Sequence, residues 1–319
     1  MPPPRPADPL VSVVAPVLNE EACVAELAQR VDAVLRSAGV RHELLFVDDG
    51  SSDATPARVL ALRAADPRVK LVRFTRRFGH QAALLAGLHL ARGDAVVTMD
   101  GDLQHPPETL GALIDAWRGG ADVVQAVRED ETPQAGTWKE RTSRAFYGLM
   151  ARLAEVPVVP AGADFRLLDR RAVDALKQLD ERAVFLRGLV PWLGFAEARV
   201  AYRVAPRHAG DPKFDLRRML RLGLDGVVAF STAPLRLISV VGLVTTFLGL
   251  AYGVFALVAH LLGRVEASGW TSLVVVVLVF GGVQLTSLGV VSEYVGRIYQ
   301  EVKRRPRWVI ERAEGIDAP

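Results

Sequence analysis

The segment Val96–Glu108 reads VVTMDGDLQHPPE and joins a short apolar run to an acidic turn. The apolar run is typical of a buried β-strand, which Pro106-Pro107 prevents from continuing. Asp100 and Asp102 follow at the end of this strand, where two carboxylates repel each other and lose hydration. Mg²⁺ or Mn²⁺ is a suitable partner, because these ions bind a few carboxylate oxygens together with phosphate oxygens of a substrate. Gln104 can add a neutral oxygen ligand.

Taken alone, an Asp-Gly-Asp sequence is more often an ordinary surface turn, so its neighbours decide between a turn and a site. Apolar runs and helical patterns alternate before it. The predicted strands are Leu10–Ala15, Leu44–Val47, Lys70–Phe74 and Asp94–Met99, and the predicted helices are Ala22–Ser37, Asp53–Ala65 and Gln81–Ala91. This alternation predicts an α/β domain with a mostly parallel sheet covered on both faces.

Acidic clusters follow three of these strands. They are Asn19-Glu20, Asp48-Asp49 and Asp100-Asp102. In open parallel sheets, ligands bind beyond the carboxyl ends of the strands, so the three clusters are expected to share one binding site. Three coincidences at one sheet edge favour a site over chance surface charge.

Composition and motifs exclude several other classes. The formal net charge of +3 gives no reason to expect a nucleic-acid partner, and the single cysteine, Cys23, excludes an internal disulfide. The sequence contains no GxGxxG after the first strand, no GxxxxGK[ST] loop, and no Gly-x-Ser-x-Gly or HExxH pattern. A diphosphate would therefore meet cationic side chains. The candidates are Arg128, Lys139, Arg141, Arg144, Arg207 and Lys213.

The middle of the chain alternates less clearly. Phe165–Leu168 is a candidate strand, Arg171–Leu179 a helix and Ala198–Val204 an edge strand. Phe214–Phe230 mixes arginines with apolar residues, which suits a helix in the membrane interface or an amphipathic helix of a soluble protein.

Mean hydropathy is +0.21, and the apolar excess lies after Leu235. Leu237–Leu262 contains no charged residue, and Trp270–Ser292 is a second apolar stretch of similar length. Both are long enough to cross a bilayer, which disfavours a buried helical hairpin. Basic residues flank the pair on its outer sides, so the positive-inside rule predicts that both flanks face the cytoplasm.

Seven stretches together resemble family 2 glycosyltransferases that act on polyprenyl phosphates. They are APVLNEE, FVDDGSSD, FGHQAALLAGL, MDGDLQHPPE, ADFRLLD, RHAGDPKF and EYVGRIYQEVKRRPRW. Similar enzymes are dolichyl-phosphate mannose synthases and bacterial undecaprenyl-phosphate glycosyltransferases with two C-terminal membrane helices. The resemblance implies a GT-A fold, which is Rossmann-like with a mostly parallel sheet. It also implies a nucleotide-sugar donor, a divalent metal, and inverting transfer to a polyprenyl phosphate.

The resemblance also sets the expected domains. Residues 1–9 are expected to be a disordered tail and residues 10–212 the GT-A domain. Juxtamembrane amphipathic helices would occupy residues 213–236, two transmembrane helices 237–295, and a basic cytoplasmic tail 296–319. The protein would lie in the cell (inner) membrane as a multi-pass protein with a cytoplasmic catalytic domain.

Functional residues follow from the resemblance, motif by motif. The positions implied to contact the nucleotide are Pro16, Leu18, Glu20, Val47, Asp49, Asp100 and Gly101. The implied metal ligands are Asp100, Asp102 and Gln104, and the implied phosphate-binding residues are Arg128, Arg141, Arg207 and Lys213. Two positions depart from the family pattern: Gly101 stands where alanine is usual, and Pro212 where serine is usual.

Asp164, in ADFRLLD, resembles a position proposed as the catalytic base in the bacterial enzymes. It could equally orient Arg166 or a sugar hydroxyl, because a phosphate acceptor is already an anion and has less need of a base. Two alternative functions stay open: a non-catalytic nucleotide-sugar-binding scaffold and a polysaccharide synthase. The sequence does not specify the sugar, UDP is preferred over GDP as the carrier, and association into a homo-oligomer stays open.

Overall fold

The computed structural model describes residues 5–129, 164–179, 186–203, 232–262 and 269–316. The chain divides into two compact units. One contains the β-sheet and includes the segment that follows Arg304, and the other contains two long C-terminal helices.

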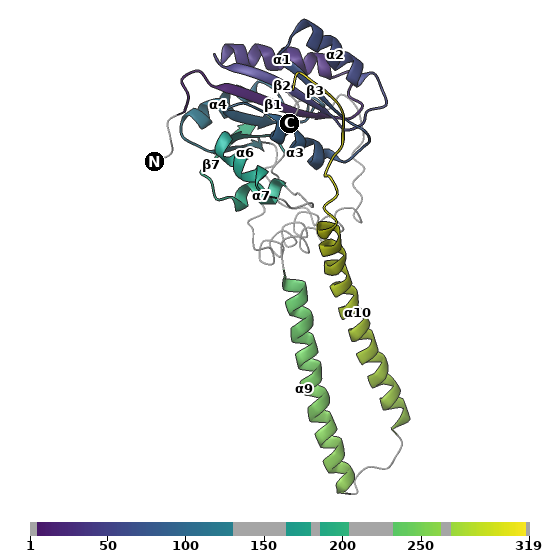
Figure 1. Ribbon diagram of the computed structural model, residues 1–319. Helices are drawn as coiled ribbons and strands as arrows, with labels where there is room; N and C mark the ends of the chain where they lie inside the picture. The colour runs from purple at the N-terminus through teal and green to yellow at the C-terminus, as the bar shows by residue number, and fades with distance from the viewer. Residues whose placement is uncertain (1–4, 130–163, 180–185, 204–231, 263–268, 317–319) are drawn as a thin grey trace. The chain divides into compact units, whose positions relative to one another are not determined.

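The sheet has the strand order β7-β5-β6-β4-β1-β2-β3-β8 within the described residues (Figure 1). The strands are β1 (Leu10–Val17), β2 (Arg41–Asp48), β3 (Val69–Phe74), β4 (Ala95–Thr98), β5 (Val123–Arg128), β6 (Arg166–Asp169), β7 (Glu197–Tyr202) and β8 (Ile310–Glu314). β1 pairs in parallel with β2 and β4, β2 with β3, and β5 with β7. β6 is antiparallel to β4 and β5, and β8 is antiparallel to β3. The predicted mostly parallel α/β sheet is confirmed.

Helices cover both faces of the sheet (Figure 1). One layer holds α1 (Val24–Ser37), α2 (Thr55–Ala65) and α4 (Thr109–Arg118), and the other holds α3 (His80–Leu90), α6 (Arg170–Lys177) and α7 (Leu186–Trp192). α1 buries four apolar side chains at helical spacing: Val24, Leu27, Val31 and Leu35. Removing a side chain of this kind from water contributes about 1.5–3 kcal/mol, which explains how α1 stays fixed on the sheet.

Close packing fixes α3, whose first residues reach the carboxyl edge of the sheet. Gly87 lies against Val14 of β1, and a Cβ atom there would come within 2.1 Å of a Val14 methyl carbon. Only glycine therefore allows this approach between helix and strand. The consequence is a well-defined position for His80 and Gln81 at the start of the helix.

The N-terminal segment corrects one prediction. Arg5 belongs to the predicted disordered tail, yet its guanidinium donates to Asp122 and Asp169 and lies 5.1 Å from the centre of the Trp117 ring. These contacts attach residue 5 to the sheet domain, so the tail prediction is wrong for this residue. A Pro-rich composition carries no signal for a single buried ion-pair cluster.

The C-terminal segment corrects a second prediction. Residues 296–319 are predicted to be a basic cytoplasmic tail, but the second long helix extends to Val302 and residues 310–314 form β8. Trp308 stacks on Phe74 with a centroid distance of 6.5 Å, and Thr75 donates its backbone N–H to the Val309 carbonyl at 3.0 Å. The segment after the helix thus supplies an edge strand of the sheet.

The helical unit consists of α9 (Ala233–Leu261) and α10 (Trp270–Val302). Each contains an apolar stretch long enough to cross a membrane, 28 residues at Pro234–Leu261 and 30 at Leu273–Val302. Large apolar side chains are exposed along both helices, including Leu243 at 72% and Leu285 at 71%. Such exposure suits helices in lipid rather than the core helices of a soluble protein. The expected amphipathic helix at 214–230 lies outside the described residues.

Candidate active site

A cavity of about 480 Å³ opens at the carboxyl edge of β1, β2 and β4. Its volume suits a ligand of nucleotide-sugar size. The residues that line it are Pro16, Val17, Leu18, Glu20, Asp49, Arg77, His80, Asp100, Gly101, Asp102 and Arg187. All three acidic clusters that follow strands in the sequence contribute to this lining, as the α/β topology predicts.

The loops after β1 and β2 are tied together beside the cavity. Asn19 donates its backbone N–H to Ser51 Oγ at 2.9 Å, and its side-chain oxygen accepts the Ser52 backbone N–H at 2.9 Å. Glu20 donates its backbone N–H to Thr55 Oγ1 at 2.9 Å. Asn19 adopts a positive φ of 59°, which asparagine tolerates better than most residues. These hydrogen bonds fix the loop that carries Glu20 beside the cavity.

Asp49 joins the end of β2 to the loop before α3. One of its oxygens accepts the Phe78 backbone N–H at 2.6 Å, and the Gly79 N–H reaches the carboxylate at 2.9 Å. Gly50 follows with φ of 81°, and a Cβ atom there would lie 2.8 Å from the Arg76 carbonyl carbon. Glycine is therefore required at this position. Asp49 both lines the cavity and fixes the start of α3.

Hydrogen bonds and close packing fix the acidic turn after β4. Asp100 donates its backbone N–H to His105 Nδ1 at 3.0 Å, and the His105 ring stacks on Phe165 at 4.9 Å. Gln104 donates from its backbone N–H to Asp102 at 3.1 Å and from its side-chain amide at 2.5 Å. At Gly101, a Cβ atom would lie 2.9 Å from the Pro16 carbonyl oxygen, so the turn packs closely on β1. These contacts fix the turn that carries the Asp100 and Asp102 carboxylates.

The charge of Asp100 is poorly compensated. Burial raises the pKa of Asp100, and the neighbouring Asp102 raises it further against the opposing effect of two histidines. Among the described residues, its Oδ1 atom is buried without a hydrogen-bond partner, and His80 Nε2 lies 3.5 Å from it. An unsatisfied carboxylate oxygen beside a second carboxylate fits a bound cation.

The metal-ligating groups on the protein are few. In the ranges that the structure describes, no cluster of three or more His, Cys, Asp or Glu side chains has a metal-binding arrangement. Two carboxylates suit a magnesium-like ion, which keeps several positions for water and substrate phosphate oxygens. Asp100 and Asp102 therefore fit a divalent cation that is shared with a phosphate ligand, and Gln104 holds Asp102 in place.

Asp164 lies at the centre of a buried cluster behind the cavity, where it is 3% exposed. Arg187 donates to both carboxylate oxygens, at 3.2 and 3.1 Å, and Gln81 donates its amide at 3.0 Å. Arg166 donates at 3.3 Å, and His80 Nε2 lies 3.5 Å away. Burial raises the pKa of Asp164, but the contacts with His80 and the arginines outweigh it and hold this pKa far below its usual range.

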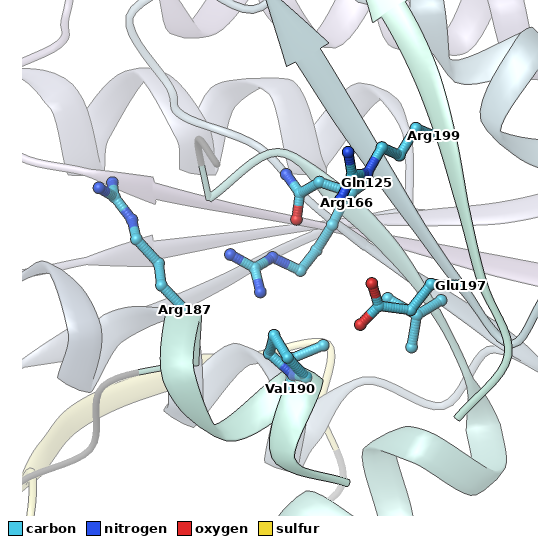
Figure 2. Close-up of a pocket in the computed structure, with 8 residues that line it drawn as sticks. Gln125, Arg166, Arg187, Val190, Glu197 and Arg199 are labelled. Atoms are coloured by element: carbon cyan, nitrogen blue, oxygen red, sulfur yellow. The ribbon is translucent and has the colours of Figure 1, made fainter. Parts of the chain in front are cut away.

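A second, small cavity of about 20 Å³ lies beside Arg187 and has room for about one water molecule (Figure 2). Arg166 from β6, Arg187 from α7 and Arg199 from β7 line it together with Gln125 and Glu197. Arg187 is shared by the two cavities, whereas Arg199 lines only the small one.

Most predicted nucleotide-binding residues come together in the large cavity, although their contact with a nucleotide stays a prediction. Val47 is an exception, because it is fully buried in β2 opposite Pro16 and does not line the cavity. Arg128 is exposed at the end of β5, away from the cavity lining. Arg141, Arg207 and Lys213 lie outside the described residues.

Three cavity residues with basic side chains escaped the motif-by-motif prediction: Arg77, His80 and Arg187. His80 lies inside the quoted stretch FGHQAALLAGL, and Arg77 immediately precedes that stretch. Arg187 lies in a short helix that contains Pro191, which hides the helical pattern.

The fold of the sheet domain has a solved counterpart. It is similar to the mannosyltransferase PcManGT from Pyrobaculum calidifontis, solved in complex with GDP-Man and Mn²⁺, with a TM-score of 0.51. The match covers 71% of this chain and 65% of that chain at 19% sequence identity, so it shows the fold alone. The sheet domain has a GT-A fold, as predicted.

The family follows from sequence. The model of glycosyl transferase family 2 matches residues 12–177, and the chain belongs to this family. A second model, the GtrB C-terminal hairpin, matches residues 233–298, which indicates membrane association. The prediction that the protein is a glycosyltransferase is confirmed.

The chain matches several relatives over nearly their whole length. The chain is 40% identical over 306 residues to the uncharacterized glycosyltransferase YkcC of Bacillus subtilis (strain 168), covering 96% of this chain and 94% of the relative. It is 38% identical to the prophage bactoprenol glucosyl transferase homolog of Escherichia coli (strain K12), covering 95% and 99%. It is 39% identical to the bactoprenol glucosyl transferase of Shigella phage SfII, covering 95% and 98%.

Proposed function

We propose that this protein transfers one monosaccharide from a nucleotide sugar to a polyprenyl phosphate at the cytoplasmic face of the cell membrane. The observation that carries the proposal is the Asp100-Asp102 pair on a cavity of nucleotide-sugar size, with an unsatisfied carboxylate oxygen. The C-terminal hairpin and the bactoprenol glucosyl transferases among the relatives support a lipid acceptor.

The donor would lie along the carboxyl edge of the sheet. Pro16, Leu18, Glu20 and Asp49 would receive the base and ribose, because they line the part of the cavity built by the end of β1 and the loops after β1 and β2. The diphosphate would then reach the acidic turn after β4. UDP is the preferred carrier, from the resemblance to bacterial enzymes.

The residues around the turn fit Mg²⁺ or Mn²⁺, with Asp100 and Asp102 as ligands. When bound, the ion would neutralise charge on the departing nucleoside diphosphate. The chain's own residues position the reactants: Gln104 orients Asp102, and His105 holds the backbone of Asp100. The acceptor phosphate is already an anion, so positioning and charge stabilisation are the main requirements for inverting attack on the anomeric carbon.

The orientation follows from basic residues around the hairpin. Arg236 lies at the start of α9, and Arg297, Lys303, Arg304 and Arg305 lie near the end of α10 or just beyond it. The sequence between the two helices has Arg264 and Glu266 as its charged residues. By the positive-inside rule, this asymmetry supports a cytoplasmic catalytic domain and a multi-pass arrangement in the inner membrane.

A transfer assay tests the proposal. The full-length protein in detergent would receive undecaprenyl phosphate, Mg²⁺ or Mn²⁺, and a panel of radiolabelled UDP- and GDP-sugars. We expect label to enter the lipid fraction, and to be lost with EDTA and in Asp102→Asn. Asp115→Asn, an exposed aspartate of α4, is the matched control and should keep wild-type activity.

Other outcomes would overturn the proposal. Label in a polymer would point to a polysaccharide synthase. Nucleotide-sugar binding without transfer to any offered acceptor would support a scaffold. Transfer that persists in EDTA and in Asp102→Asn would remove the metal from the proposal.

A further inference from the structure

Two guanidinium groups meet one carboxylate beside the donor cavity. Arg166 and Arg187 both donate to Asp164, and His80 lies 3.5 Å from it. This cluster lies next to the acidic turn, since His80 is also 3.5 Å from Asp100.

Arg187 extends from this cluster to the cavity. Its Nε and Nη2 atoms contact the two oxygens of Asp164, which is the paired geometry that fixes the plane of a guanidinium. The side chain is nevertheless 45% exposed and lines the cavity, whereas Asp164 lies behind it with 3% exposure. Asp164 therefore fixes the orientation of an Arg187 side chain that is partly exposed in the cavity lining.

The position of Asp164 is unsuitable for removing a proton from an acceptor. Both oxygens already accept hydrogen bonds from Arg187, with Gln81 and Arg166 as further donors. His80 and Arg187 line the cavity, and Asp164 does not. A general base has to come within hydrogen-bond reach of the proton that it abstracts.

We propose that Asp164 is a positioning residue, and that it holds Arg187 against the diphosphate of the donor. This inference rests on the proposed nucleotide-sugar donor. Arg77 assists from the wall that carries Asp49, because its side chain is 74% exposed, lines the cavity and lies 3.9 Å from that carboxylate. Arg187 and Arg77 would thus contact the diphosphate from two sides, and the acidic turn with its cation would contact it from a third.

Binding of UDP, UMP and uridine with Mg²⁺, measured by calorimetry on the full-length protein in detergent, tests the inference. We expect Arg187→Gln to weaken UDP binding by about 10- to 100-fold, the cost of losing a charge-assisted hydrogen bond. Uridine binding should be unchanged, because uridine has no phosphate. Arg187→Lys should restore part of the loss, since it keeps the charge but not the paired geometry.

Asp164→Asn distinguishes positioning from proton transfer. A positioning role predicts weaker UDP binding in Asp164→Asn, and a double variant with Arg187→Gln that binds no worse than Arg187→Gln alone. The pH profile of transfer should keep its acidic limb in Asp164→Asn. Arg199→Gln is the matched control, because Arg199 lines only the small cavity, and UDP binding should not change.

The opposite results would overturn the inference. If Asp164→Asn abolishes kcat and the acidic limb while UDP binding stays at the wild-type level, Asp164 is the base. If Arg187→Gln binds UDP as the wild type does, Arg187 does not contact the diphosphate, even if Asp164→Asn fails to fold. A wild-type protein that binds no nucleotide would instead overturn the proposed function itself.

Discussion

Two pairs of aspartates lie at opposite edges of the same sheet, and their surroundings differ. Asp100 and Asp102 follow the carboxyl end of β4, while Asp169 pairs with Ala95 at its start and lies near Asp122. Asp169 accepts hydrogen bonds from the Trp117 indole N–H at 2.8 Å and from the Arg171 backbone N–H at 3.0 Å. It also accepts a hydrogen bond from the Arg5 guanidinium.

The two pairs show that a cluster of carboxylates is not by itself a site. At the amino edge, Arg5 and Arg171 supply a cation for each of Asp122 and Asp169, and the cluster is complete. At the carboxyl edge, one oxygen of Asp100 has no hydrogen-bond partner within the described residues. We propose that this uncompensated carboxylate belongs to the ligand-binding edge, whereas the balanced cluster stabilises the fold.

Asp102→Asn should give the largest effect, a loss of transfer of roughly a thousandfold, because a bound cation contributes several kcal/mol to transition-state stabilisation. The Tm without metal should not fall, since the substitution removes repulsion between two carboxylates. Initial rates and thermal unfolding in EDTA check the two statements. A variant that loses activity only because it unfolds would contradict the contrast between the edges.

Asp169→Asn should lower the stability of the fold and leave the transfer activity unchanged. It breaks a largely buried ion-pair cluster, so we expect a loss of about 3 kcal/mol, or roughly 6–12 °C in Tm. The activity per folded molecule should stay near that of the wild type. Thermal unfolding followed by circular dichroism, with transfer rates measured well below the Tm, separates the two quantities. A large fall in activity with an unchanged Tm would place Asp169 in the site instead.

Acid should remove the contribution of Asp169. Burial raises the pKa of Asp169, but the Trp117 and Arg171 hydrogen bonds and Arg5 outweigh it and lower the net pKa. A depressed carboxyl pKa stabilises the fold above the unfolded pKa of about 3.9, and this stabilisation is lost as pH falls through the folded pKa. The Tm difference between wild type and Asp169→Asn should be constant above about pH 5 and shrink below about pH 4. A difference that grows on acidification would have the wrong sign.

Arg36→Ala should give the smallest fall in Tm. Arg36 pairs with Asp32 at 3.0 Å across one helical turn, and its side chain is 66% exposed. An exposed pair of this kind contributes about 0.3–0.5 kcal/mol, so the Tm should fall by no more than about 2 °C. A drop as large as that of Asp169→Asn would show that burial does not separate the two kinds of ion pair.

Local patterns in the sequence predicted the central sheet and the acidic edge. The strands from Leu10 to Thr98 are short apolar runs between helical patterns, and the topology of parallel sheets places their acidic ends together. The two long helices were equally clear from length and composition. These features depend on neighbours in sequence, which is why pattern alone is enough.

The missed features depend on distant partners. β8 has the sequence IERAE with only its ends partly buried, and it pairs with β3 from more than two hundred positions away. Arg5 contacts residues more than a hundred positions away. Arg187 reaches the cavity from α7, a short helix with an internal proline. A local pattern contains no information about such partners.

The return of the chain to β8 makes the membrane hairpin an insertion between two strands of one sheet. A stop codon placed before the hairpin would not yield a smaller soluble enzyme, because it would also remove Trp308 from Phe74 and leave β3 as an open edge. Open edges of this kind invite pairing between molecules and aggregation. A soluble version therefore has to excise the hairpin internally and rejoin residues 305–316 to the sheet domain.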